Sequence, residues 1–161
     1  MANIFLPEHF KIVSATPAGP VTTNGGVTFD VVNLEQAVMV WIVAQFHQDV
    51  GHATTIQPVV GVGFAAATAI TFTTNWWRNA DMATTDTLVA IADATACPCT
   101  AAATDQMIVI QIDPAEVAAQ NATFTHLGGT IATSAQANNY VSATYYIQNR
   151  YPQATPATAI V

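Results

Sequence analysis

Apolar and polar residues alternate with a period close to two along most of the chain, and Val, Ile, Thr, Phe, Tyr and Trp dominate these segments. Both features are typical of β-strands. The clearest candidate is residues 38–46 (VMVWIVAQF), in which apolar side chains are nearly continuous. Such a run predicts a central strand that is covered on both faces.

Seven further segments share this pattern, and turn signals such as residues 23–26 (TNGG) and 127–130 (LGGT) lie between them. These segments are residues 27–32, 54–62, 69–73, 87–92, 107–112, 122–126 and 140–146. Short strands separated by such turns predict an all-β fold, an antiparallel β-sandwich with a jelly-roll-like organisation.

At most one short helix is expected, over residues 113–119. Asp113 is a suitable N-cap, Pro114 suits the first helical position, and Glu116 places an acidic side chain in the first turn.

The two ends of the chain differ from its middle in composition. Residues 14–26 are rich in Pro, Gly and Thr, and residues 152–161 combine two prolines with the apolar pair Ile160 and Val161. We therefore expect an N-terminal arm over residues 1–26, a sandwich domain over 27–150 and a C-terminal arm over 151–161. Extended arms of this kind dock onto neighbouring subunits, and frayed termini are the alternative.

The charged fraction of the sequence, 8%, is far below the roughly 25% that is usual in soluble domains. Thr, Asn and Gln fill the polar positions instead, so the surface provides little repulsion between copies. We expect the chain to associate with itself, as a homotrimer, or with other protein subunits.

The cations are Lys11, Arg78 and Arg150, against ten carboxylates, for a formal net charge of −7 at pH 7. Nucleic-acid binding is not expected, because it requires several Lys or Arg side chains to neutralise phosphates. A membrane span is not expected either, since the longest strongly apolar run, residues 37–44, is shorter than the roughly 18 to 20 residues required. The N-terminus lacks the pattern of a signal peptide, which predicts synthesis in the cytoplasm without export.

No catalytic, metal or cofactor site is expected from the reactive residue types. Cys97 and Cys99 are too close for an unstrained disulfide and have no second cysteine pair beside them, which predicts free thiols. The four histidines have no ligand-like spacing, the serines lie in no nucleophile-elbow pattern, and the glycine pairs do not open a phosphate-binding loop. Asp81 and Asp86 are read as turn-capping residues. We therefore expect a protein that is not an enzyme.

Trp76-Trp77-Arg78 is the most conspicuous aromatic cluster. In a strand the two indoles point to opposite faces, so one fills the core and the other points outward beside an arginine, a composition typical of interfaces. Burial of both indoles is the alternative. A second stretch of this kind lies near the end of the chain. The candidate interface residues are Trp76, Trp77, Arg78, Arg150, Tyr151, Ile160 and Val161.

Four stretches carry a resemblance to a known family: VWIVAQF, the run from Trp77-Arg78-Asn79 to TTDTL, MIVIQIDP, and NNYVSATYYIQNRYPQATPATAIV. Through them residues 38–161 resemble small proteins encoded beside the major capsid protein of many tailed phages. The resemblance implies a capsid cement or decoration protein that binds the outer surface of the phage head, with the major capsid protein as its partner. The alternatives are a structural protein of the tail, neck or fibre base, and a carbohydrate-binding sandwich that uses Trp76 or Trp77 as a stacking platform.

Overall fold

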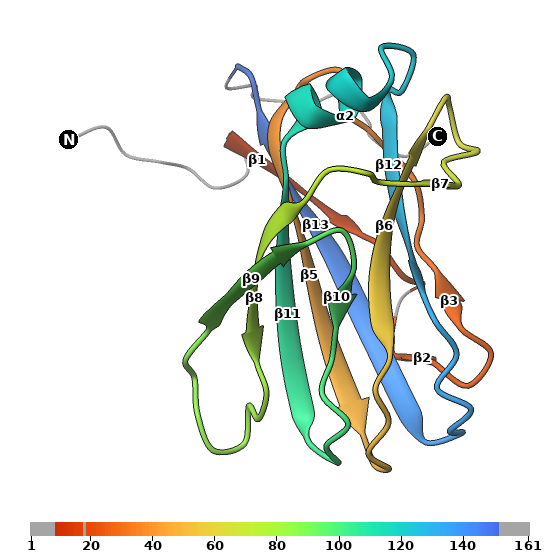
Figure 1. Cartoon of the computed structure of the whole chain (residues 1–161), viewed down its shortest axis with the longest axis vertical. Coiled ribbons are helices and arrows are strands. Elements are labelled where there is room, and N and C mark those ends of the chain that lie inside the picture. Colours follow the sequence, from red (N-terminus) through yellow and green to blue (C-terminus); the bar gives the residue numbers. More distant parts are fainter. Residues whose placement is uncertain (1–8, 18, 152–161) are drawn as a thin grey trace.

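Two antiparallel β-sheets form a sandwich in the computed structural model, which describes residues 9–17 and 19–151 (Figure 1). Sheet A has the strand order β1-β13-β5-β11-β8-β9, and β2 also pairs with β13. Its strands are β1 (Phe10–Ser14), β13 (Asn139–Asn149), β5 (Ala37–Gln48), β11 (Asp105–Ile112), β8 (Thr74–Asn79), β9 (Val89–Ala94) and β2 (Val21–Thr22). The predicted all-β antiparallel sandwich is confirmed.

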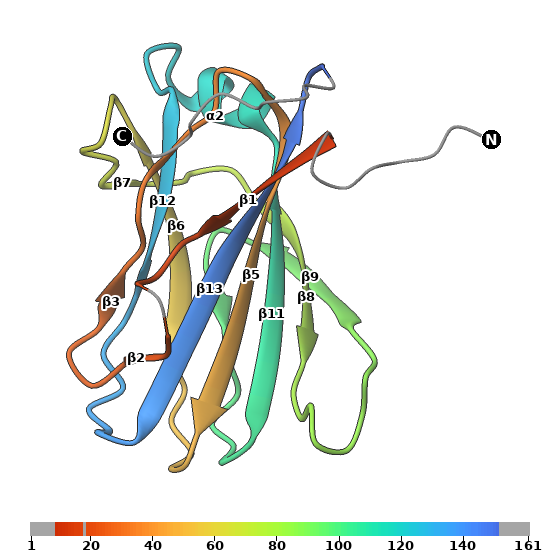
Figure 2. The ribbon, with the colours of Figure 1, turned by 180° about the vertical axis from the view of Figure 1, so that it is seen from behind.

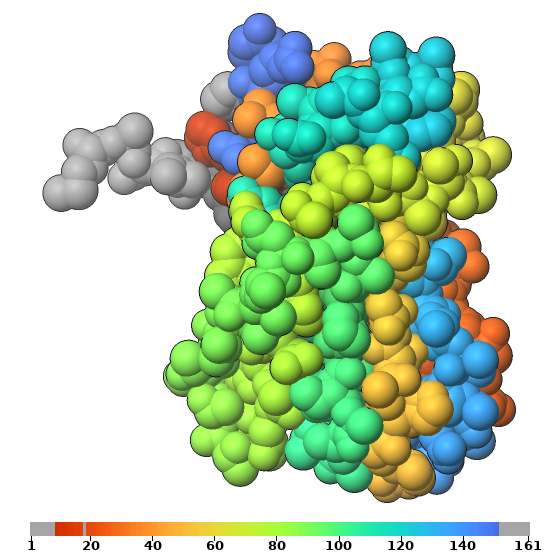
Figure 3. Space-filling view, viewed as in Figure 1, coloured from red at the N-terminus to blue at the C-terminus, as the bar shows by residue number. Residues whose placement is uncertain are grey.

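Sheet B has the order β10-β6-β12-β3, with β4 on β12 and β7 on β6. Its strands are β10 (Cys97–Pro98), β6 (Thr55–Gly61), β12 (His126–Ile131), β3 (Val27–Thr28), β4 (Val32–Asn33) and β7 (Thr68–Ala69). Figure 3 shows the yellow-green segment between β7 and β8 crossing the molecule below α2, and Ile70 in this segment is buried in the core. The loop before β7 covers part of the outward side of sheet B, because Ala66 lies against Gly61 and Gly128.

Alternation along the strands determines which side chains fill the space between the sheets. In β5, Val40, Ile42, Ala44 and Phe46 are buried. Burying one such aliphatic or aromatic side chain stabilises the fold by about 1.5–3 kcal/mol, and a one-residue slip of register would turn the whole set outward. The register of β5 is therefore strongly specified. Its partners in the core include Ile56, Val60, Ile108, Ile110, Leu127, Tyr145 and Ile147.

The predicted helix is confirmed as α2 (Pro114–Gln120), which lies across one end of the sandwich (Figure 1). Asp113 is its N-cap, and its carboxylate accepts a hydrogen bond of 2.8 Å from the N–H of Ala115. Val117 is the buried residue that attaches the helix to the core.

The described part of the predicted N-terminal arm belongs to the sandwich, which corrects the expectation for residues 1–26. β1 pairs with β13 over five residue pairs, and β2 pairs with the same strand. Val13 and Ala15 are buried. The alternation in β1 is short and interrupted by Lys11, so the segment has little strand signal of its own; the free edge of β13 provides its partner. Residues 1–8, 18 and 152–161, including Ile160 and Val161, lie outside the described residues.

Three predicted strands differ from the structure. The strand expected at residues 27–32 is divided into β3 and β4, with residues 29–31 between them, and two others are misplaced. The strand expected at residues 122–126 is β12, which begins only at His126 and runs through the glycines that were expected to form a turn. The segment at residues 69–73 contributes only its first residue to a strand, as part of β7, and the next strand is β8. Glycine in a local sequence usually signals a turn, but in a strand it can mark a place where another part of the chain packs closely on the backbone. In β12 the ring of Phe29 occupies the space beside Gly129.

Candidate interaction surface on the outer face of sheet A

The side of sheet A that points away from the core carries large apolar side chains on adjacent strands, and Figure 2 views the sheet from this side. In β5 the outward residues Met39, Trp41 and Val43 alternate with the buried ones and are themselves half-buried. The sandwich covers only one side of this strand. The near-continuous apolarity of residues 38–46 therefore leaves apolar side chains on a surface that the described chain does not cover.

The strand register places these outward side chains in rows. Tyr146 on β13 pairs with Trp41 on β5, which in turn pairs with Gln111 on β11. In the next row Thr144, Val43, Val109 and Trp77 lie side by side on four strands. At the β1 edge the Phe10 ring lies 5.8 Å from the Trp41 ring, and Ile12 is 49% exposed opposite Tyr146. We call this surface the outer face; its apolar residues are Phe10, Ile12, Met39, Trp41, Val43, Trp77, Met107, Val109 and Tyr146.

Carboxylates border the outer face at its two ends. At the α2 end a groove is lined by Asp93, Asp113 and Glu116 together with Met39 and Gln111. At the opposite end Nδ1 of His47 lies 2.6 Å from Oδ1 of Asp105. The rows between contain no charged side chain of the described chain. An apolar, aromatic centre inside a polar rim is the usual anatomy of a protein–protein interface.

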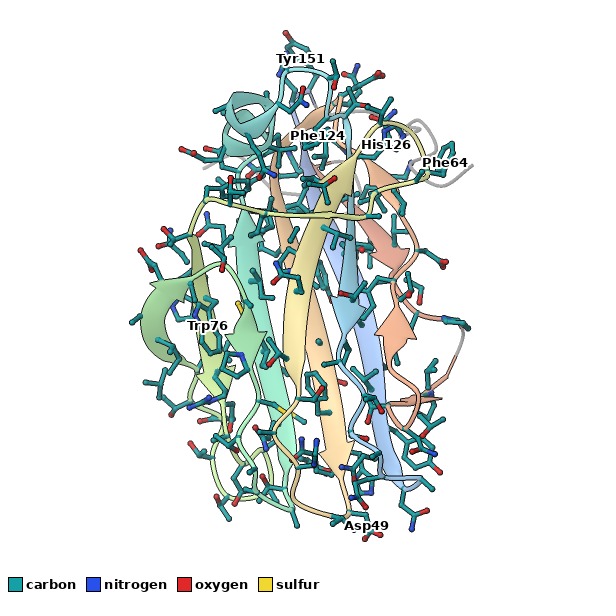
Figure 4. All side chains as sticks on the ribbon, turned by 45° about the vertical axis from the view of Figure 1, so that its right-hand side comes forward. Asp49, Phe64, Trp76, Phe124, His126 and Tyr151 are labelled. Atoms are coloured by element: carbon teal, nitrogen blue, oxygen red, sulfur yellow. The ribbon has the colours of Figure 1, made fainter. Side chains whose placement is uncertain are left out.

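The tryptophan pair divides between the two sides of sheet A, as the strand alternation predicts. Trp76 is buried, and its indole N–H donates a hydrogen bond of 2.9 Å to the carbonyl of Ala92 (Figure 4). Trp77 is half-buried and lies on the outer face between Val109 and Ala90.

Arg78 does not accompany Trp77 on the outer face. It pairs with the inward-facing Ile108, and its guanidinium lies 5.8 Å from the centre of a Trp76 ring and donates to the carbonyl of Pro98. Of the Trp76-Trp77-Arg78 cluster, only Trp77 therefore contributes to this surface.

The second predicted stretch lies elsewhere. Tyr151 is exposed at the α2 end of the sandwich (Figure 4). Arg150, the residue before it, is also exposed, and its N–H donates to the carbonyl of Gln36. The sequence predictions also missed Trp41, Val43 and Tyr146 as surface residues. The signal for this surface was the nearly continuous apolar run of β5, which places apolar side chains on both sides of the strand. The sequence analysis predicted that the fold itself would bury both sides.

The His47–Asp105 pair has the residue types of a catalytic base and the carboxylate that orients it. Ser142 lines the same shallow depression, and the His47 ring stacks on Tyr140 with ring centroids 6.5 Å apart. Among the described contacts no hydrogen bond joins Ser142 to His47, and the neighbouring backbone pairs within the β5–β13 and β5–β11 ladders. Nucleophilic catalysis needs a hydrogen bond between nucleophile and base and a set of donors for the oxyanion. The arrangement as it stands supplies neither.

The two cysteines are buried free thiols with structural contacts. Sγ of Cys99 accepts hydrogen bonds from Nε2 of Gln48 at 2.9 Å and from the N–H of Thr54 at 3.3 Å. Burial raises the pKa of both thiols, that of Cys97 to about 11. Within residues 9–17 and 19–151, no group of three or more His, Cys, Asp or Glu side chains is placed to hold a metal ion.

The geometry defines a class of structure, an antiparallel β-sandwich with an uncharged aromatic face on one sheet. Searches of protein-family models, curated proteins and solved structures each gave no match. Among the described residues, no helix has the length and apolar character needed to cross a membrane.

Proposed function

We propose that this chain is a non-catalytic structural protein of a tailed-phage virion, a capsid cement or decoration protein that binds the outer surface of the head through the outer face of sheet A. The observation that carries the proposal is the apolar cluster of Trp41, Val43 and Val109, which spans two adjacent rows on the uncovered side of the central strands. The assignment to a phage head comes from the sequence resemblance, and the outer face supplies a surface suited to binding another protein.

The energetic argument is the desolvation of aromatic side chains. Tryptophan and tyrosine dominate the residues whose truncation weakens protein interfaces most, and they act from the centre of a patch that excludes water. Trp41 and Tyr146 are neighbours near the middle of sheet A, with Phe10 and Ile12 beside them. A contact of standard size buries about 800 Å² on each partner, and its effect is repeated at every site of a lattice.

The charges favour a partner other than a second copy at this face. The rim contains Asp93, Asp105, Asp113 and Glu116, whereas Lys11 and Arg78 extend from positions opposite inward-facing residues of sheet A. Two copies placed face to face would bring the four rim carboxylates of each copy together, with Arg150, exposed at the α2 end, as the arginine near them. The carboxylates outnumber this cation, and like charges across an interface oppose binding. The expected partner surface is apolar at its centre and basic at its rim, and the proposed partner is the major capsid protein.

The test is co-sedimentation of the purified chain with phage heads assembled without it. Truncating a central interface tryptophan costs about 2 kcal/mol or more, so Trp41→Ala should weaken binding by about thirtyfold or more. Phe64→Ala is the matched control, because Phe64 is 51% exposed but lies outside the outer face. Binding should also weaken as salt is added, owing to the acidic rim.

Each outcome bears on the proposal. Loss of binding with Phe64→Ala and not with Trp41→Ala would reject the outer face as the binding surface. No binding to heads, together with a single ring of copies per particle, would favour the tail, neck or fibre base. Binding on a glycan array that is lost with Trp77→Ala would favour the carbohydrate-binding alternative, for which the buried Trp76 is unsuited.

A further inference from the structure

A second apolar surface, separate from the centre of the outer face, lies at the α2 end of the sandwich. It is a groove of about 640 Å³ between α2, the beginning of β5 and the turn that follows α2. Val38, Ala118 and Phe124 are among the apolar residues that line it, and the charged residues Glu35, Asp113 and Arg150 line it as well. Val38 is 44% exposed, so the groove is open to solvent in the described chain. Figure 4 shows Phe124 and Tyr151 at this end of the molecule.

The described chain ends beside this groove. Arg150 lines it, Tyr151 follows with 64% of its surface exposed, and residues 152–161 (PQATPATAIV) come next in the sequence. This segment has no charged side chain and carries the aliphatic pair Ile160 and Val161. Its composition suits an apolar groove with small alanine side chains in its wall.

The reach of the segment decides which copy of the groove it fits. Pro152 and Pro156 fix their own φ angles and favour extended conformations at the residues before them. At about 3.1 Å per residue for such a chain, Ile160 would lie about 28 Å from Tyr151. The wall formed by α2 has seven residues and is only about 10 Å long. A segment that stays extended would therefore carry Ile160 and Val161 past the α2 wall of its own copy.

We propose that residues 152–161 of one copy dock into the α2 groove of a second copy, with Ile160 and Val161 against Val38 and Phe124. Each copy then donates one C-terminal segment and accepts another in its groove, which makes the contact head-to-tail. Such contacts close into a ring when the rotation between neighbouring copies allows it. Proline reduces the conformational entropy lost on docking. The inference concerns self-association and does not depend on binding to a phage head.

Disulfide trapping in the full-length chain tests the proposal. Val38→Cys and Ile160→Cys are made as two separate variants, mixed and oxidised, and the products are separated by mass under denaturing conditions. The native thiols interfere little, because Cys97 and Cys99 are buried. The mixture should form a covalent dimer, with its link mapped to residues 38 and 160 by mass spectrometry. Val89→Cys mixed with Ile160→Cys is the control, since Val89 is 55% exposed but lies on β9; it should give several-fold less dimer.

The double variant Val38→Cys/Ile160→Cys separates the possible occupants. Links between copies support the proposal. A link within one chain would overturn it in favour of docking into the same copy's groove, and a yield no higher than that of the Val89 control would overturn it altogether. Circular dichroism before oxidation verifies that each variant is folded. Loss of trapping with retained head binding would reject this inference alone, whereas the reverse result would reject the proposed function alone.

Discussion

The ring of Phe29 packs on Gly129 so closely that a Cβ atom at residue 129 would come within 2.5 Å of Phe29 Cδ2. Phe29 is itself buried, and its ring packs edge-on against the Tyr145 ring with the ring centroids 6.5 Å apart. The aromatic ring thus occupies the space that a side chain on β12 would fill, and the missing Cβ is a packing requirement at this position.

Gly129→Ala should therefore destabilise the sandwich, because overpacking a filled site costs about 1–3 kcal/mol. Urea unfolding followed by circular dichroism measures the loss. Gly25→Ala is the control, since a Cβ at residue 25 meets nothing within 4 Å. Equal stability of the two variants would show that the Phe29 ring moves aside freely.

Cys99→Ala should destabilise the fold more than Cys99→Ser. Alanine leaves the N–H of Thr54 without the acceptor that Sγ provides and removes one acceptor of Gln48. A buried donor left unsatisfied costs about 1–3 kcal/mol, whereas the serine hydroxyl keeps an acceptor in nearly the same place. The free energy of unfolding of the two variants decides the matter, and a serine variant as unstable as the alanine variant would contradict the role of Sγ as an acceptor.

His126 should make the fold less stable in mild acid. Burial lowers the pKa of His126, an effect that nearby Glu35 partly opposes, and the Phe64 ring lies edge-on at 5.1 Å from the imidazole. The unfolded chain therefore binds more protons at this site than the folded chain does, so the free energy of unfolding falls as the pH drops below the ordinary histidine pKa of about 6.5. His126→Gln should reduce that dependence in thermal melts between about pH 7.5 and about pH 5.5. An unchanged pH dependence in this variant would assign it to other groups.

Trp76→Ala should destabilise the fold much more than Trp77→Ala, because Trp76 is buried and Trp77 is half-buried on the outer face. Truncating a buried tryptophan costs about 3–5 kcal/mol, and the Trp76 variant also leaves the carbonyl of Ala92 without its indole donor. Trp77 is half-buried on the outer face, so its truncation should lower the melting temperature much less. Thermal denaturation compares the two variants; a larger loss for Trp77 would contradict the assignment of the indoles to their faces.

Local sequence was sufficient for the elements whose signal lies within a few residues. The period-two pattern of residues 107–112 and 140–146 predicted strands in β11 and β13, because alternating residues of a strand point to opposite faces. The nearly continuous apolar run of residues 38–46 predicted the central strand β5. The Asp113-Pro114-Ala115-Glu116 run predicted α2 because N-cap chemistry depends only on neighbours in the chain. The low fraction of charged residues predicted a surface suited to association with other subunits. That association is a proposal.

What the tertiary structure alone decided involves partners far apart in the sequence. β1 is a strand because the edge of β13 lies beside it, and β12 is a strand because Phe29, a hundred residues earlier, fills the space above Gly129. The side chains of β5 form two alternating sets, and both are largely apolar. The sequence of this strand does not indicate which set faces the second sheet and which set, with Trp41, faces outward. Strand pairing and packing join segments whose contacts form only when the chain folds, so the physical cause of each element lies outside the local sequence that forms it.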